Sequence, residues 1–142
     1  CDADQPMLDR HGLQMLETSG CSLGESYYIT SMCMVVTAMT ELFLQSFDGN
    51  VCDIFPVTLT AAPVAFDNLM SSFGFAASGH WEDGRAEVTL SVTRQTEVTL
   101  RLGRCCRGNY ALLDADGREI GRFEGGKLFA EMAEGEYRII SV

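Results

Sequence analysis

Between Arg85 and Thr93 the sequence alternates apolar and polar residues without interruption, and a period of two is the signature of a β-strand. The apolar positions are Ala86, Val88, Leu90 and Val92, and the polar positions are Arg85, Glu87, Thr89, Ser91 and Thr93. Successive side chains of a strand point to opposite faces, so one face of this strand is buried and the other is solvated. Such a strand is stable only in a sheet whose apolar face is covered by a second layer.

The sequence on both sides of this strand consists of short apolar segments separated by turn residues. Asp83-Gly84 and Asp114-Ala115-Asp116-Gly117 predict tight hairpin turns. Pro56 makes residues 51–58 an edge strand or a linker, and Gly74 is an irregularity in a strand over residues 69–81. Further strands are expected at residues 98–102, 110–113, 128–132 and 137–142. This pattern predicts an antiparallel β-sandwich over residues 51–142.

Residues 1–50 show helical spacing instead, and we expect a helical segment there. The strongest helix is predicted over residues 28–47, with Gly49 as its C-cap glycine. A weaker helical pattern covers residues 7–16, and a loop is expected over residues 19–26. The apolar positions of the strongest helix are Ile29, Met32, Cys33, Val35, Val36, Ala38, Met39, Leu42, Phe43 and Phe47. These positions surround much of the helix, which predicts that it is buried on several sides.

Charge and polarity exclude two classes of partner. The formal net charge is −10, from 20 acidic and 10 basic residues, and a surface of that sign repels nucleic acid. The nearest basic cluster, formed by Arg101, Arg104 and Arg107, is interrupted and is typical of a strand-end loop. A membrane span is also disfavoured, because polar residues interrupt the apolar run of the strongest helix. These residues are Thr37, Thr40, Glu41 and Gln45.

The six cysteines do not form a recognisable metal or redox motif. No Cys-x-x-Cys pair occurs, so the sequence predicts neither a zinc site nor a thioredoxin-like centre. Cys33 lies in an apolar run and is expected to be a small buried residue. Cys105 and Cys106 are adjacent and are therefore poor disulfide partners. The pattern favours reduced thiols and a cytoplasmic location.

No group of residues predicts a catalytic or cofactor site within this chain. His11 and His80 are isolated, and no nucleophile elbow or phosphate-binding fingerprint is present. The residues Asp114 to Gly117 lack the remaining ligands of a calcium loop and favour a turn. Glu25 and Glu41 are 16 residues apart, which is about 24 Å along a helix and too far for an acid–base pair.

The segment from Glu41 to Gly84 resembles a known family. Residues 41–49, Glu-Leu-Phe-Leu-Gln-Ser-Phe-Asp-Gly, are similar to the sequence E-M-L-L-Q-S-H-D-G near the end of family 95 glycoside hydrolases, the α-L-fucosidase family. Ile54-Phe55-Pro56 resembles the L-F-P that precedes the closing β-domain of that family. Leu69, Gly74-Phe75, Trp81 and Asp83-Gly84 fit its segment G-L-R-A-R-G-G-F-E-V-D-I-E-W-K-D-G without a gap. The resemblance covers residues 25–93 and extends more loosely to residue 142.

This resemblance implies an α+β chain in which residues 1–50 end an (α/α)6 catalytic barrel and residues 51–142 form a C-terminal β-sandwich. Residues 28–47 would be a late helix of that barrel, and the barrel itself would lie upstream in the same protein. The chain begins at Cys1 without a visible signal peptide, as the middle of a longer protein would. The function implied is support of a fucosidase-like catalytic barrel, without a catalytic residue, metal or cofactor in this chain.

At one position near the catalytic centre of the family, this sequence has a different residue. The family sequence I-D-G-N, whose Asp lies near the catalytic centre, falls on Ile29-Thr30-Ser31-Met32. Thr30 lacks the carboxylate that a general base needs at neutral pH. Glu25 is the nearest substitute carboxylate and is retained as a candidate substrate-binding residue.

Two alternatives remain open. The chain could be a stand-alone carbohydrate-binding or interaction module, for which Trp81 is the main candidate and Tyr110 and Tyr137 are further aromatic candidates. Packing in the core or in a hairpin is the favoured interpretation of each of these rings. The other alternative is a homo-oligomer that assembles through the apolar helix at residues 28–47.

Overall fold

A computed structural model describes residues 15–18, 21–57 and 62–142, and its contacts divide the chain into two units, Cys1–Met39 and Thr40–Val142. In the first unit, β1 (Met15–Thr18) pairs antiparallel with β2 (Cys21–Gly24), and α1 (Glu25–Glu41) follows directly. The predicted helix over residues 7–16 is therefore wrong at its end, and its residues 7–14 lie outside the described part. A loop was predicted over residues 19–26. This prediction is wrong for residues 21–26, which form β2 and the start of α1.

The long helix ends earlier than its apolar spacing predicted. Helix α1 stops at Glu41, and β3 (Leu44–Phe47) follows, paired antiparallel with β4 (Val51–Ile54). Leu44 is buried, and this cross-strand pairing outweighs the helical spacing of the residues around it. Gly49, expected to cap a helix, instead adopts a φ of 79° in the turn of the β3–β4 hairpin, next to Asn50 at 57°.

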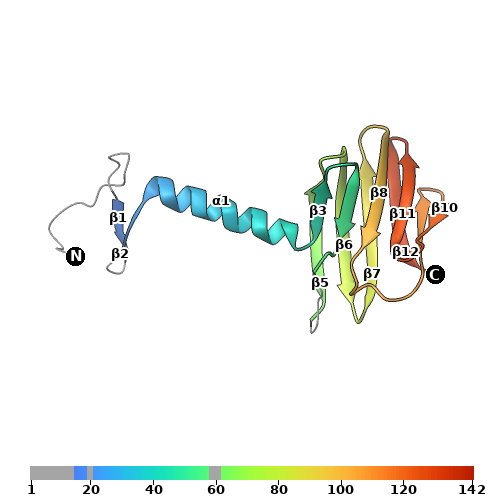
Figure 1. The fold of residues 1–142 in the computed structure, drawn as a ribbon, viewed down its shortest axis with the longest axis horizontal. Coiled ribbons are helices and arrows are strands. Elements are labelled where there is room, and N and C mark those ends of the chain that lie inside the picture. The colour runs from blue at the N-terminus through green and yellow to red at the C-terminus, as the bar shows by residue number, and fades with distance from the viewer. Residues whose placement is uncertain (1–14, 19–20, 58–61) are drawn as a thin grey trace. The chain divides into compact units, whose positions relative to one another are not determined.

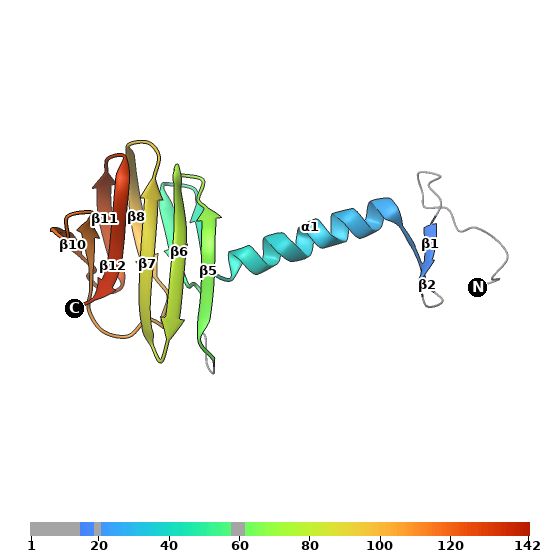
Figure 2. The same cartoon turned by 180° about the vertical axis from the view of Figure 1, so that it is seen from behind.

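The second unit is a sandwich of two sheets (Figure 1, and from behind Figure 2). One sheet has six strands in the order β10-β9-β12-β7-β6-β5, and the other has four in the order β11-β8-β4-β3. The remaining bounds are β5 Val64–Met70, β6 Phe75–Glu82, β7 Arg85–Val92, β8 Thr96–Leu102, β9 Tyr110–Asp114, β10 Glu119–Arg122, β11 Lys127–Met132 and β12 Gly135–Ser141. The predicted β-sandwich is present, and all pairs are antiparallel except β4 with β8.

Two strand predictions are corrected by this topology. Strand β4 lies between β3 and β8 and is not an edge strand, because Pro56 comes after its last residue and leaves its ladder intact. The strand predicted over residues 69–81 is two strands, β5 and β6, joined by a turn. In that turn Gly74 has a φ of 85°, and the Ser71 hydroxyl accepts hydrogen bonds from the N–H groups of Phe73 and Phe75 at 3.2 and 3.4 Å.

The alternating strand and both hairpins are confirmed. The four apolar residues of β7 are at most 3% exposed, whereas the polar residues between them are exposed. Asp83 and Gly84 both have positive φ, at 49° and 86°, as a tight hairpin between β6 and β7 requires. At the second hairpin, Asp114 Oδ1 accepts hydrogen bonds from the backbone N–H groups of Asp116 and Arg118, so this aspartate closes the turn.

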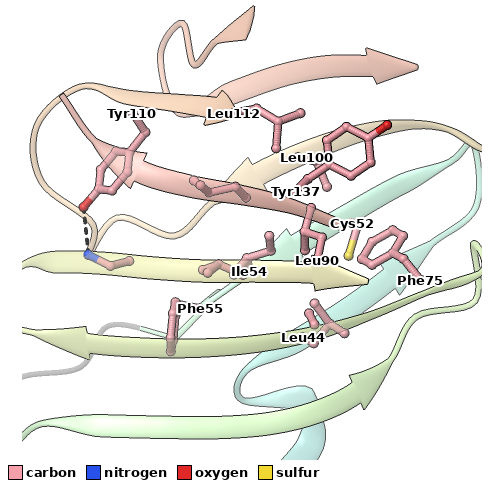
Figure 3. Packing of buried hydrophobic residues seen from close by; sticks show 14 of the residues in the cluster. Leu44, Cys52, Ile54, Phe55, Phe75, Leu90, Leu100, Tyr110, Leu112 and Tyr137 are labelled. Carbon is pink, nitrogen blue, oxygen red and sulfur yellow. Dashed lines mark hydrogen bonds between the residues drawn. The ribbon is translucent and has the colours of Figure 1, made fainter. Parts of the chain in front are cut away.

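The core lies between the two sheets and draws on both (Figure 3). Its largest fully buried side chains are Phe55, Phe75, Ile54, Leu90, Leu100, Leu112, Met132, Ile139, Val98 and Cys52. Glycine permits one close approach in this layer, since a Cβ on Gly79 would lie 2.6 Å from the ring of Phe66. Burial of these apolar faces is the main favourable contribution to folding.

Tyr110 connects β9 to the hairpin between β6 and β7 inside the core. Its hydroxyl accepts a hydrogen bond from the Ala86 N–H at 3.0 Å, drawn as a dashed line in Figure 3. The same hydroxyl lies 3.4 Å from the Gly84 carbonyl oxygen, to which it donates. Burial raises the pKa of Tyr110, so the hydroxyl stays protonated and able to donate at neutral pH.

Replacing Tyr110 by Phe is expected to leave the Ala86 N–H without its partner. An unsatisfied buried donor costs about 1–3 kcal/mol, so Y110F should lower the free energy of unfolding by about that amount. Urea denaturation monitored by the fluorescence of Trp81 measures the change. The matched control is Y137F, whose hydroxyl donates to the Ala133 carbonyl at 3.2 Å in a partly buried site. Equal losses in the two variants would contradict the role given to Tyr110.

Candidate functional site

The aromatic residues considered for sugar binding lie in the core. Trp81 is 6% exposed, and its indole Nε1–H donates a hydrogen bond to the Cys105 carbonyl at 3.1 Å. Tyr110 and Tyr137 are 2% and 9% exposed. Stacking on a sugar requires an open ring face, which none of these three side chains presents. The structure therefore favours the core alternative for all three.

The other candidate residues of the sequence lie in α1. Glu25 is the first residue of α1, and Thr30 lies within it. The side chains of both residues lie outside the described part of the structure. Glu25 and Trp81 also belong to different units of the chain.

Titratable side chains gather at the tip of the β6–β7 hairpin, in a hollow lined by His80, Glu82, Asp83, Arg85 and Glu87. His80 Nε2 lies 3.6 Å from Glu82 Oε2, and the two side chains are 53% and 58% exposed. Exposed groups of this kind are screened by water and lack the burial that prepares a carboxylic acid for catalysis. Among the described residues, no group of three or more potential ligands could hold a metal ion.

The described cysteines are free thiols in two environments. Cys33 is exposed, so the prediction of a buried Cys33 is wrong. Cys52 is completely buried, and this burial raises its pKa to about 12. Burial and the neighbouring Cys105 raise the pKa of Cys106 to about 12, and the two Sγ atoms lie 3.9 Å apart in a thiol–thiol hydrogen bond, without a disulfide. Cys52 and Cys106 are therefore protonated and unreactive at neutral pH.

The most conspicuous surface of the first unit is the apolar exposure of α1. Every described side chain from Cys33 to Met39 is exposed, including Met34 at 68%, Val36 at 57% and Met39 at 56%. Within the described residues, no helix is both long and apolar enough to cross a membrane. Exposed patches of large apolar side chains are characteristic of interaction surfaces.

A second exposed surface lies on the outer face of the four-stranded sheet. Phe47 is 46% exposed and Phe129 is 59% exposed. Neither residue was predicted from the sequence to lie at the surface. Phe47 was assigned to a helix, but Phe129 carried a signal, since it occupies a polar position in the alternating strand of Leu128, Ala130 and Met132.

Asp53 and Arg101 form an ion pair on the same outer face. Arg101 Nη2 donates to Asp53 Oδ2 at 2.7 Å, and Arg101 Nε donates to Asp53 Oδ1 in a second, shorter bond. This hydrogen bonding raises the pKa of Arg101, which keeps its charge. The Arg101 guanidinium carbon also lies 5.6 Å from the centroid of the Phe47 ring, within range of a cation–π interaction.

Comparison of the sequence and fold with family models, curated proteins and solved structures finds no match.

The thiol environments predict a labelling pattern. At pH 8, iodoacetamide should alkylate Cys33 at the rate of an open thiol, and Cys52 and Cys106 at least about a hundredfold more slowly, because few of their thiols are ionised. Peptide mapping by mass spectrometry after timed pulses gives each rate, and the three rates should converge in urea. Equal native rates at Cys33 and Cys52 would contradict this account.

The raised pKa values of Cys52 and Cys106 also contribute to the folding free energy below pH 9, and this contribution is lost as the pH rises toward 12.

Proposed function

We propose that this chain is the closing part of a family 95-like glycoside hydrolase, with a β-sandwich that supports a helical catalytic domain. In this proposal α1 belongs to the helical domain, and the strands from β3 to β12 form the sandwich. The bond-cleaving residues lie in the helical domain, outside this chain. The partner of α1 is thus the helical part of the same protein.

The observation that carries the proposal is the apolar surface around α1. Met34, Val35 and Val36 are consecutive and are 68%, 56% and 57% exposed. Consecutive residues of a helix point about 100° apart, so these three side chains cannot share one face. A helix that is apolar all round is typical of burial among other helices. Full burial of one such side chain contributes about 1.5–3 kcal/mol, so covering α1 would stabilise the assembly by several kcal/mol.

The elements that underlie the resemblance support the same proposal. Residues 41–49 contain the end of α1, strand β3 and the start of the turn that leads to β4, so the matching segment runs from helix to sheet. Ile54-Phe55-Pro56 follows at the end of β4, where the family has its L-F-P. The segment that contains Trp81 and Asp83-Gly84 forms β6 and its hairpin turn. A helix leading into a closing β-sandwich is the layout that the resemblance implies.

The chain is proposed to lack catalytic activity by itself. Thr30 stands where the family has an aspartate, and Glu41, Glu82 and Asp83 are exposed. An exposed carboxylate lacks the enclosed apolar surroundings that a general acid of a glycosidase needs. The purified chain is expected to hydrolyse 4-nitrophenyl α-L-fucoside no faster than buffer. Turnover by this chain would contradict the proposal that the catalytic residues lie outside it.

The proposed burial of α1 is tested by introducing charge. In this chain, M34E combined with V36E should change the unfolding free energy of the sandwich by less than about 0.5 kcal/mol, since both sites are exposed. In the complete protein that includes the helical domain, the same variant should cost several kcal/mol, because each glutamate would be buried without a partner. Thermal unfolding of the two proteins gives the comparison.

The matched control for added charge is Q95E, which places a carboxylate at an exposed loop position of the sandwich. It should be neutral in both proteins. A complete protein that tolerates M34E/V36E as well as Q95E would overturn the placement of α1. Concentration-dependent association of this chain in sedimentation experiments, abolished by M34E/V36E, would favour the homo-oligomer instead.

A further inference from the structure

The register of the four-stranded sheet aligns four residues in one row across all its strands. Phe47 is opposite Val51, Val51 is opposite Thr99, and Thr99 is opposite Phe129. The next residues along three of these strands, Cys52, Leu100 and Ala130, point into the core. Since side chains alternate along a strand, the row lies on the outer face of the sheet. Neighbouring strands are about 4.8 Å apart, so the two phenylalanines are separated by about 14 Å.

Polar residues border this row on both sides. Along the strands, the next outward-facing row is Gln45, Asp53, Arg101 and Lys127. On the other side lie Glu97 and Glu131, which are directly opposite each other and exposed. These four residues consequently form a strip one residue wide and four strands long, with an exposed aromatic ring at each end and the partly buried Val51 and Thr99 between the rings.

One end of the strip is held in place before any ligand arrives. The Arg101 guanidinium lies over the Phe47 ring and is itself fixed by two hydrogen bonds to Asp53. An arginine has five N–H donors, and this pair uses two of them, so donors remain for another partner. A side chain that is already ordered loses less entropy on binding, which favours affinity.

We propose that this strip binds a neutral glycan chain. A pyranose ring has apolar C–H faces and hydroxyl groups at its rim, which match exposed phenylalanine rings bordered by hydrogen-bonding side chains. A helix or sheet of a partner protein would need a broader patch, since stable interfaces bury about 800 Å² on each side. The net charge of −10 disfavours acidic glycans and other polyanions. The length of about 14 Å favours an oligosaccharide over a single sugar. This inference is independent of the helical domain proposed above.

Affinity electrophoresis of the full chain in native gels tests the proposal. The gels contain soluble β-glucan, galactomannan or xyloglucan, with polygalacturonate as the acidic comparison. At least one neutral polymer should retard the chain, and polygalacturonate should not. F129A should weaken binding by about tenfold or more, and F47A should weaken it similarly, whereas F129Y should retain it.

The matched controls are M70A and I120A, which truncate exposed apolar residues of the other sheet, 66% and 44% exposed. Both should leave retardation unchanged. Urea denaturation verifies that each variant is folded, and Phe129 is the safer test because it is the more exposed ring. No retardation by any neutral polymer, or equal losses in M70A and F129A, would overturn the proposal. Self-association that depends on Phe129 would identify the strip as a protein contact and would overturn it as well.

Discussion

The contact between the apolar faces of two sheets is the interaction on which the rest of the sandwich depends. Strand β7 contributes four residues to this layer, and β8 and β4 supply Leu100 and Ile54 from the opposite sheet. Because each strand exposes its alternate residues, burial of one set fixes which side chains remain at the surface. The core and the two outer faces are thus consequences of one register, and a shift by a single residue would invert both.

The junction between α1 and β3 shows how this layer decides local structure. Residues 42–47 have spacing that suits a helix, yet residues 44–47 pair with β4 and bury Leu44. Phe43 packs nearby on Phe66 with ring centroids 5.7 Å apart. The free energy of covering the edge of the core outweighs the small differences in intrinsic helix propensity, which amount to less than about 1 kcal/mol per residue. The end of α1 is therefore set by the sandwich.

Both proposals start from apolar side chains that the described fold leaves at the surface. The helix presents methionine and valine in several directions, which suits a surrounding layer of helices. The outer row of the four-stranded sheet is narrow and bordered by polar groups, which suits a thin amphipathic ligand. The difference between the two proposed partners follows from the shape of each apolar surface.

The alternation over Arg85–Val92 and the Asp-Gly turn determined a half-buried strand and its hairpin, because side-chain period and turn geometry are local properties. The sequence likewise predicted the sandwich and most of its later strands. Only the tertiary structure decided that β4 is interior, that Phe47 belongs to a strand, and that Trp81 is covered. It also decided the row from Phe47 to Phe129, since these residues are far apart in the chain and meet only through the order and register of four strands. Pairing between distant segments depends on which surfaces are buried together, and a local sequence pattern does not determine which segments pair.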